Sequence, residues 1–258
     1  MSGSGEKPVL IVDGKRLDGR LPGDIRPSRI EANVLKNAAG SAYIEWGNNK
    51  IMAAVYGPSE ALPKHTSNPE RAVIKCRYQM APFSSLEEHG RSGPNRRSIE
   101  ISKVIKEVFE NAIITENFPG SEINIYVEVL QGDGGTRAAG VTAAAVAVAA
   151  SGIPMTDLPY GVSIGKIGDQ IVIDLNKIED NYSDADVPIV ISPRTGRILL
   201  LQMDGDMTKD EINRGIRMAA DAGKMISKMQ SDALKKQYME ISEKYKNEAP
   251  SYTPQAQK

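Results

Sequence analysis

The sequence predicts an α+β fold in which two similar, strand-rich halves are each packed with helices. Two observations predict that the chain consists of two similar halves. β-Prone runs precede an amphipathic helix in residues 41–116, and the same order recurs between residue 123 and a long C-terminal helix. A third observation concerns the join, where a glycine-rich turn leads into a segment of Ala and Val. No internal repeat is clear enough to prove that one half is a copy of the other.

The composition suits a globular protein, with 258 residues that are 40% hydrophobic and 25% charged. No run of 18 apolar residues occurs and the first seven residues are polar, so we expect neither a membrane-spanning nor a secreted protein. The single cysteine, Cys76, excludes an internal disulfide and favours a reducing, cytoplasmic location. Because it lies in a predicted strand without an obvious histidine partner, we interpret Cys76 as structural.

The charges nearly cancel, since 32 basic and 33 acidic residues give a net charge of −1. Proteins that bind polyanions over a broad surface are usually basic overall. Any contact with nucleic acid is therefore expected at a local cluster of cations.

The first half is predicted to contain three strands and one helix. Its helix has apolar residues at helical spacing on one face. A hairpin is predicted around Gly47, a third strand follows an exposed loop, and a second polar loop over residues 82–95 precedes the helix. The predicted ranges are 41–46 and 50–56 for the hairpin, 57–70 for the exposed loop, 72–80 for the third strand and 96–116 for the helix.

The second half is predicted to begin with an alternating strand over residues 123–129. The Ala- and Val-rich composition of residues 138–151 indicates a helix buried on most sides. Two hairpins follow, and the capping sequence from Thr208 to Glu211 opens a helix that reaches at least Met229. The hairpin strands are predicted over residues 162–167, 170–175, 188–191 and 197–203.

The predicted organisation is a flexible lead over residues 1–15, a single domain over residues 16–246 and a disordered tail over residues 247–258. Within that domain, three clusters of residues carry the chemical signal.

The first cluster is the glycine-rich stretch of residues 130–137 between a strand and a helix. Glycines allow a ligand to approach the backbone, and a helix N-terminus presents unpaired N–H groups to an anion. With the hydroxyl of Thr136 and the guanidinium of Arg137, Gly135 would form a phosphate site. The spacing matches neither the P-loop nor the dinucleotide fingerprint. A tight turn with an exposed arginine is the alternative interpretation.

The second cluster is acidic and is predicted to lie in a loop over residues 179–186, between two strands. Oxygen ligands of this kind can hold a divalent metal, and one carboxyl group can act as a general acid. The spacing does not match an EF-hand. A solvated acidic turn is the alternative. The four acids are Glu179, Asp180, Asp184 and Asp186.

The third cluster comprises Arg91, Arg96 and Arg97 at the start of the predicted helix over residues 96–116. The helix dipole disfavours cations at this end, so three arginines there indicate a bound anion. Ion pairs with nearby glutamates such as Glu100 are the alternative. Together the three clusters suit chemistry at a phosphodiester, without choosing between hydrolysis, phosphorolysis and polymerisation.

Several motifs resemble those of the RNase PH family, and the resemblance covers nearly the whole chain. Within the family, the similarity is greatest to the catalytic ring subunit of the archaeal exosome. The matching motifs are Leu17-Asp18-Gly19-Arg20, Pro82-Phe83-Ser84, residues 96–105, Gly152-Ile153-Pro154-Met155, Glu179-Asp180 and Asp184-Ala185-Asp186.

This resemblance implies a phosphate-dependent 3′-to-5′ exoribonuclease that releases nucleoside diphosphates from RNA and, in reverse, adds nucleotides. Inorganic phosphate, the co-substrate, would be held by Gly135, Thr136 and Arg137. Asp180 and Asp186 fall on the family's active-site aspartates and would bind Mg²⁺ and assist protonation of the leaving 3′ oxygen. We assign the general acid to Asp180 and leave metal binding to both.

The resemblance also implies contacts between RNA and four residues, with Arg96 and Arg97 at RNA phosphates and Lys64 and His65 in the loop at the entry neck. The expected assembly is a hexamer of three heterodimers with a related non-catalytic ring subunit, single-stranded RNA in the channel and RNA-binding cap subunits on one face. Two alternatives remain: a homohexameric bacterial-type enzyme that trims tRNA, and a non-catalytic ring subunit.

Three residues depart from the patterns expected within the family. Thr136 stands where archaeal exosome relatives often have serine, and Gly134 where they often have alanine, so the turn looks more like that of bacterial RNase PH. Pro188 replaces a lysine of the polynucleotide phosphorylases, which argues against that sister family.

Overall fold

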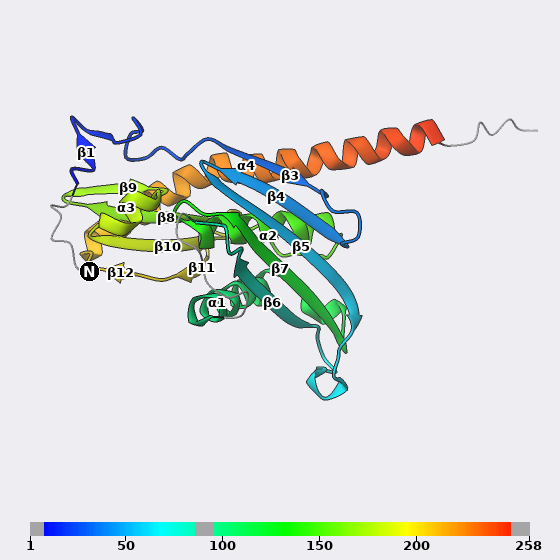
Figure 1. Ribbon diagram of the computed structural model, residues 1–258. Coiled ribbons are helices and arrows are strands. Elements are labelled where there is room, and N and C mark those ends of the chain that lie inside the picture. The colour runs from blue at the N-terminus through cyan, green and yellow to red at the C-terminus, as the bar shows by residue number, and fades with distance from the viewer. Residues whose placement is uncertain (1–7, 86–94, 249–258) are drawn as a thin grey trace, which may run out of the picture.

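The computed structural model describes residues 8–85 and 95–248, which form two sheets with helices packed between and around them (Figure 1). The mixed strand and helix content confirms the α+β prediction. Within the described residues, no helix is both long and apolar enough to cross a membrane.

The first sheet has the strand order β3-β4-β5-β7-β6. All neighbours are antiparallel except β6 and β7, which are parallel. One face of β7 is buried through alternating residues, as its sequence predicted. The strands are β3 (Ser28–Ala32), β4 (Gly40–Trp46), β5 (Asn49–Glu60), β6 (Val73–Met80) and β7 (Ser121–Gln131).

The position of β7 corrects the predicted boundary between the halves. The sequence placed this strand at the start of the second half, but β7 lies between β5 and β6 of the first sheet. Strand alternation predicts a half-buried strand and cannot tell which neighbours it pairs with. The boundary therefore follows β7, at the glycine-rich turn.

The second sheet has the order β11-β10-β8-β9, with β12 also paired to β10, and all its pairs are antiparallel. The two predicted hairpins are present with slightly different ends. The strands are β8 (Tyr160–Ile167), β9 (Gln170–Ile173), β10 (Ala185–Ile191), β11 (Ile198–Leu201) and β12 (Asp204–Gly205).

Helix α2 (Thr136–Ala150) is the shared core of the two sheets, since it contacts β4, β5 and β7 of the first and β8 and β10 of the second. Its composition allows this close packing. A Cβ at Gly40 on β4 would lie 2.2 Å from the Ala147 carbonyl oxygen, and one at Gly161 on β8 would lie 2.6 Å from that of Ala138. Small residues on both sides thus bring the two sheets onto one helix.

Two further helices cover the outside. Helix α1 (Arg96–Ala112) begins at the Asn95 cap, whose side chain accepts a hydrogen bond from the Ser98 amide at 2.8 Å, and it packs on β6 and β11. Helix α4 (Lys209–Glu248) packs on β8, β9 and β3, and its C-terminal part extends past the sheets (Figure 1). The predicted end of the first helix, residue 116, was too late because the chain turns into strand-like backbone at Ile113.

Three other predicted segments contain regular structure that the sequence did not predict. Residues of the predicted flexible lead form a small hairpin, β1 (Ile11–Val12) with β2 (Lys15–Arg16). The predicted loop after β5 contains the 3₁₀ helix η1 (Lys64–Thr66), and a second one, η2 (Thr115–Asn117), follows α1. The predicted tail is helical at residues 247–248, and residues 249–258 lie outside the described residues.

Candidate functional site

A cleft of about 550 Å³ opens at the junction of the two sheets and contains most of the predicted site. Helix α1, the start of α2, the short helix α3 (Lys177–Tyr182) and the strands around β10 supply its walls. The lining residues are Arg97, Glu100, Gly135, Thr136, Arg137, Ala138, Ser163, Asp180, Asn181, Asp186, Pro188, Gln202, Met203 and Asp204.

One wall of the cleft is the glycine turn, residues 132–137, which joins β7 to α2. Gly134 and Gly135 have φ angles of 74° and 66°, a region that favours glycine. Gly135 is the N-cap of α2 and has no side chain to cap the helix. The first-turn N–H groups are therefore available to an anion, and the positive end of the helix dipole favours one.

The hydroxyl of Thr136 is held from behind by Tyr78 on β6. The Tyr78 hydroxyl donates a hydrogen bond to Thr136 Oγ1 at 2.9 Å, and both side chains are buried. Because Thr136 Oγ1 accepts this bond, its own proton can be donated to a ligand in the cleft. Burial raises the pKa of Tyr78, which keeps the phenol protonated as the donor.

Arg137 extends along the cleft and is steadied by two partners. Its guanidinium donates a hydrogen bond to Gln202 and lies 3.6 Å from the carboxylate of Glu100. Gln202 also donates to Glu100 at 3.3 Å. The alternative interpretation paired Glu100 with the helix arginines, but its ion pair in this structure is with Arg137. A guanidinium held in this way presents its remaining N–H groups to an anion.

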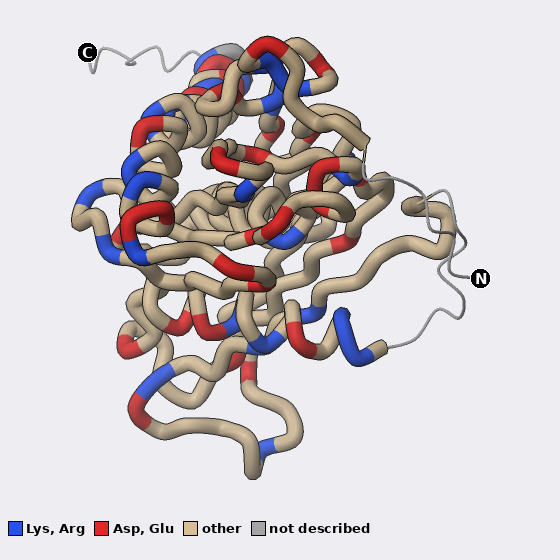
Figure 2. The backbone as a smooth tube through the Cα atoms, turned by 90° about the vertical axis from the view of Figure 1, so that its left-hand side faces the viewer, with Lys and Arg blue, Asp and Glu red and all other residues tan. Residues whose placement is uncertain are grey.

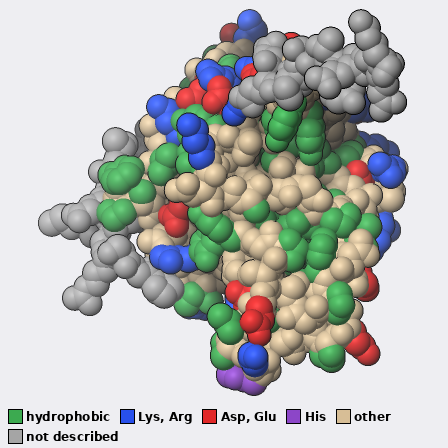
Figure 3. All heavy atoms as spheres, turned by 90° about the vertical axis from the view of Figure 1, so that its right-hand side faces the viewer, with side chains coloured by type: hydrophobic (Ala, Val, Ile, Leu, Met, Phe, Trp, Pro, Cys, Tyr) green, Lys and Arg blue, Asp and Glu red, His purple; other side chains and the backbone are tan. Residues whose placement is uncertain are grey.

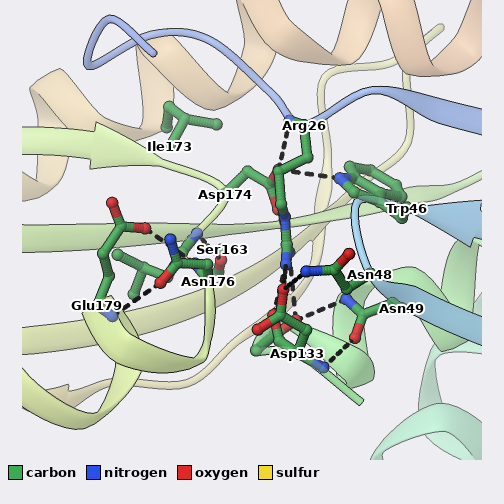
Figure 4. A network of polar contacts seen from close by, with 12 residues as sticks. Arg26, Trp46, Asn48, Asn49, Asp133, Ser163, Ile173, Asp174, Asn176 and Glu179 are labelled. Atoms are coloured by element: carbon green, nitrogen blue, oxygen red, sulfur yellow. Dashed lines mark hydrogen bonds and ion pairs between the residues drawn. The ribbon is translucent and has the colours of Figure 1, made fainter. Parts of the chain in front are cut away.

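Behind the turn, a buried polar network links it to the second sheet (Figure 4). Arg26 donates to the carbonyl oxygens of Asp133 and Gly134, and pairs with Asp174 at 2.6 Å. The side chain of Asn49 donates to the Gly134 carbonyl at 2.7 Å and accepts from the Asp133 amide. The turn is thus fixed by contacts on the side away from the cleft.

Asp180 and Asp186 form a second wall of the same cleft. Asp180 lies on α3, which begins with a capping box between Asn176 and Glu179, and Asp186 lies on β10. The sequence predicted a loop here. The helix has only six residues, so its apolar periodicity is too short to be recognised.

The aspartates share a hydrogen bond, and the pKa of each is raised, mainly by burial. Burial and the Asp180 charge raise the pKa of Asp186 to about 7. Asp186 Oδ1 is buried without a hydrogen-bond partner among the described residues. A pair of this kind can hold a proton near neutral pH, or a divalent cation in its place.

The other two acids of the predicted cluster point elsewhere. Glu179 is fully buried and accepts from Arg16 Nε at 2.7 Å. Asp184 accepts from the Gly168 amide at 2.8 Å. Asp204 lines the cleft instead, and its charge contributes to the raised pKa values of Asp180 and Asp186. The sequence did not single out Asp204 because it lies outside the predicted loop.

The predicted RNA contacts are distributed over the molecule. Arg97 lines the cleft, and its charge opposes the rise in the Asp180 pKa. Arg96 is exposed but is not part of the cleft lining. Lys64 and His65 lie in the exposed η1, where Lys64 pairs with Glu60 at 3.3 Å, and Arg91 lies outside the described residues. Of the members of this set that the structure describes, only Arg97 lines the cleft.

Basic and acidic positions are interspersed along the backbone on the side of the molecule that Figure 2 shows. Cys76 is also accounted for, since burial raises the pKa of its thiol to about 12 and keeps it protonated. A protonated thiol is a poor nucleophile, which agrees with a structural interpretation.

Comparison with known proteins decides the family. Family models described as "3′ exoribonuclease family, domain 1" and "domain 2" match residues 24–154 and 157–222. This chain belongs to the 3′ exoribonuclease, or RNase PH, family. The resemblance inferred from the motifs is thereby confirmed.

Individual members of the RNase PH family match nearly the full chain. Exosome complex component Rrp41 of Pyrococcus abyssi is 53% identical over 242 residues, which cover 92% of this chain and 97% of the relative. The protein of the same description from Thermoplasma volcanium is 54% identical over 230 residues, covering 89% and 92%. The family assignment thus extends over both halves and includes the cleft.

Solved structures of RNase PH relatives share the fold. Rice (Oryza sativa) Rrp46 aligns with a TM-score of 0.77 at 24% identity, over 85% of this chain and 100% of that chain. A chain from the Archaeoglobus fulgidus exosome with RNA bound to the active site aligns with a TM-score of 0.72 at 22% identity, over 84% and 93%. At these identities the likeness confirms the arrangement of the two sheets.

Proposed function

We propose that this chain is the phosphate-dependent 3′-to-5′ exoribonuclease subunit of an archaeal-type exosome. One observation carries the proposal: the glycine turn with Arg137 and the Asp180–Asp186 pair line the same cleft. A site for an attacking phosphate beside groups that can protonate a leaving oxygen suits phosphorolysis. The near-full-length similarity to Rrp41 proteins supports the exosome as its assembly.

In the proposed reaction, inorganic phosphate lies on the N–H groups at the start of α2, with Thr136 and Arg137 as further donors. An oxygen of this phosphate attacks the phosphorus of the last phosphodiester of RNA. The bond from phosphorus to the 3′ oxygen of the preceding nucleotide breaks, and a nucleoside 5′-diphosphate is released. The departing 3′ oxygen takes a proton, which we assign to Asp180. Addition of nucleotides from diphosphates is the reverse of the same step.

Magnesium fits the second wall of the cleft. Asp186 Oδ1 is a buried carboxylate oxygen without a hydrogen-bond partner among the described residues, and Asp180 lies beside it. Two carboxylates plus oxygens of the substrate are the ligands that Mg²⁺ prefers in phosphoryl transfer. We propose that Asp180 and Asp186 hold the ion, whose charge would offset the negative charge that develops in the reaction. The raised pKa of Asp186 would fall on binding.

RNA is proposed to reach the cleft past Arg97, with Arg96, Lys64 and His65 contacting the strand further out. The proposed ring of three heterodimers requires surfaces for neighbouring subunits. Exposed apolar side chains gather in several groups on the face that Figure 3 shows, the right-hand side of Figure 1. These groups suit packing against a related non-catalytic subunit, and RNA-binding caps would complete the assembly. A cytoplasmic location stays a prediction, which cell fractionation can test.

The proposal is tested by the products made with and without phosphate. We expect the full chain, co-expressed with its ring partner, to release nucleoside diphosphates from a single-stranded RNA only when phosphate is added. Chromatography distinguishes these from the monophosphates that hydrolysis would give. Monophosphates at full rate in phosphate-free buffer would overturn the proposal. If the chain alone formed a hexamer as active as the co-expressed complex, the homohexameric alternative would be favoured instead.

A further inference from the structure

We propose that Arg26 and Asp174 are a positioning pair that holds the glycine turn in its phosphate-binding conformation. This inference rests on the proposed function, because it assigns a role within the phosphate site. Neither residue lines the cleft. Both are buried, with 5% of Arg26 and 3% of Asp174 exposed, so any effect on phosphate must pass through the turn.

The contacts of Arg26 determine which way the turn faces. One guanidinium nitrogen donates to the Asp133 carbonyl and another to the Gly134 carbonyl, the latter at 3.2 Å. These two carbonyl oxygens therefore point toward a buried cation and away from the cleft. If a peptide of this turn flipped, a carbonyl oxygen would face the anion where an N–H group is needed. The positive φ angles of Gly134 and Gly135 make such flips sterically accessible.

Asp174 in turn fixes the orientation of Arg26. Its carboxylate accepts from Arg26 Nη2 at 2.6 Å, from Arg26 Nε at 3.0 Å and from the Arg26 backbone amide at 2.7 Å. Trp46 Nε1 adds a fourth hydrogen bond at 3.0 Å (Figure 4). Asp174 itself has a φ of 61°, unusual for a residue other than glycine. This strained backbone conformation persists because the Asp174 carboxylate is bonded to the guanidinium of Arg26.

The same contacts connect the turn to the helix that carries Asp180. Asp133 accepts a hydrogen bond from the Lys177 amide at 3.3 Å, at the first residue of α3. A Cβ at Gly134 would lie 2.5 Å from the carbonyl carbon of Asn176, the cap of α3. The turn and α3 thus touch directly, so a displacement of the turn also changes its distance from Asp180.

The test is Arg26→Lys, which keeps the charge but cannot donate to two carbonyls and a carboxylate at once. The first readout is phosphate binding without RNA, measured as the rise in melting temperature of the full chain on adding inorganic phosphate, with chloride at matched ionic strength. The second is the phosphate concentration for half-maximal rate in the assembled complex. We expect this concentration to rise by at least about fivefold, and RNA affinity to stay within about twofold of wild type.

Ile123→Ala is the matched control for a general loss of stability. Ile123 is fully buried at the end of β7 opposite the glycine turn, so its truncation opens a cavity far from the site. We expect it to lower the melting temperature without altering the half-saturating phosphate concentration. If Arg26→Lys does not fold, Asp174→Asn is the second variant, since it keeps the shape of the side chain but removes one of the two oxygens that accept from the Arg26 side chain.

The outcomes separate the inference from the proposed function. A folded Arg26→Lys or Asp174→Asn protein with wild-type phosphate dependence would overturn the positioning role. An equal rise in the half-saturating phosphate concentration with Ile123→Ala would overturn it too, because the effect would then be one of stability. Wild-type degradation that needs no phosphate would instead remove the proposed function itself.

Discussion

The two walls of the cleft satisfy their polar groups in opposite ways. On the wall of the glycine turn, the carbonyls of Asp133 and Gly134 and the hydroxyl of Thr136 are bonded to buried partners behind the surface. On the other wall, Asp186 has an unpartnered buried oxygen among the described residues, and its pKa is raised. The first wall therefore offers fixed donors to an anion, including the uncapped N–H groups at the start of α2, whereas the second is completed by a proton or a cation. We infer that the first wall binds and the second reacts.

Removing the acid should give the largest effect. Asp180→Ala is expected to lower phosphorolysis by at least about 100-fold, the usual contribution of a general acid, while RNA binding stays largely intact. Release of nucleoside diphosphate and retention of RNA on a filter measure the two. Asp184→Asn is the matched control, because Asp184 bonds to the Gly168 amide outside the cleft. Turnover of Asp180→Ala within tenfold of wild type would remove this residue from the mechanism.

On the binding wall, Arg137→Ala should raise the phosphate concentration for half-maximal rate. Loss of a charge-assisted contact costs about 1.5–3 kcal/mol, roughly tenfold or more. RNA affinity measured without phosphate should change much less. The reverse reaction should weaken in parallel, since the terminal phosphoryl group of a diphosphate would use the same site. An unchanged phosphate requirement would contradict the assignment of this wall.

Because of Asp186 on the reacting wall, the folded chain should become less stable as pH rises. The pKa of Asp186 is near 7 in the folded chain, above its ordinary value of 3.8, so between these pH values the folded state binds more protons than the unfolded state. The contribution of Asp186 to the stability of the folded state is therefore fully present below about pH 4 and is lost as pH rises through about 7. In EDTA above pH 7, Asp186→Asn should gain about 1 kcal/mol or more, which is roughly 2–4 °C in melting temperature.

A gain of this kind that is independent of pH would show that Asp186 is not the titrating group. Mg²⁺ provides a second check on the same wall. Added to wild type above pH 7, it should raise the melting temperature, and Asp186→Asn should lose most of that rise.

A smaller effect is expected from Tyr78→Phe, which removes only the donor behind Thr136. A neutral hydrogen bond contributes about 0.5–1.5 kcal/mol, so the half-saturating phosphate concentration should rise roughly two- to tenfold. The maximal rate at saturating phosphate should stay near that of wild type. A fall in the maximal rate alone would place Tyr78 with the reacting wall instead. Steady-state kinetics over a phosphate series separate the two results.

The smallest effect is expected at Arg97, past which RNA is proposed to reach the cleft. Arg97→Glu should weaken RNA binding and reduce its dependence on salt by about 0.7 in the logarithmic slope, the value for one contact to single-stranded nucleic acid. Lys103→Glu is the control on the same helix, because Lys103 is exposed, lies outside the cleft lining and is not among the proposed RNA contacts. Binding titrations at several salt concentrations give both slopes. Equal losses for the two variants would mean that general charge, and not the cleft, recognises RNA.

Much of the reacting chemistry could be predicted from the sequence, because it lies in short contiguous stretches. The glycines before Thr136 and the two aspartates six residues apart carry local signals and family motifs. The supporting residues could not be found in this way. Arg26 meets Asp174 across 148 residues, and Tyr78 meets Thr136 across 58, so only the folded chain brings each pair together.

The same distinction explains the errors in the fold. Periodicity identified β7 as a strand but not its partners, which depend on contacts with β5 and β6 far back in the chain. The six-residue α3 was taken for a loop because its helix depends on the Asn176 cap and on burial of Glu179 by Arg16. Tertiary contacts of this kind override weak local preferences.

The distribution of the cleft along the chain has a consequence for how activity begins. Its lining runs from Arg97 to Asp204, and the turn is braced further back by Arg26. A nascent chain on the ribosome therefore cannot build the site before Asp204 has been synthesised, which happens only after about four-fifths of the 258 residues have been made. A partly synthesised chain would be unable to attack the 3′ end of any nearby transcript, its own messenger included.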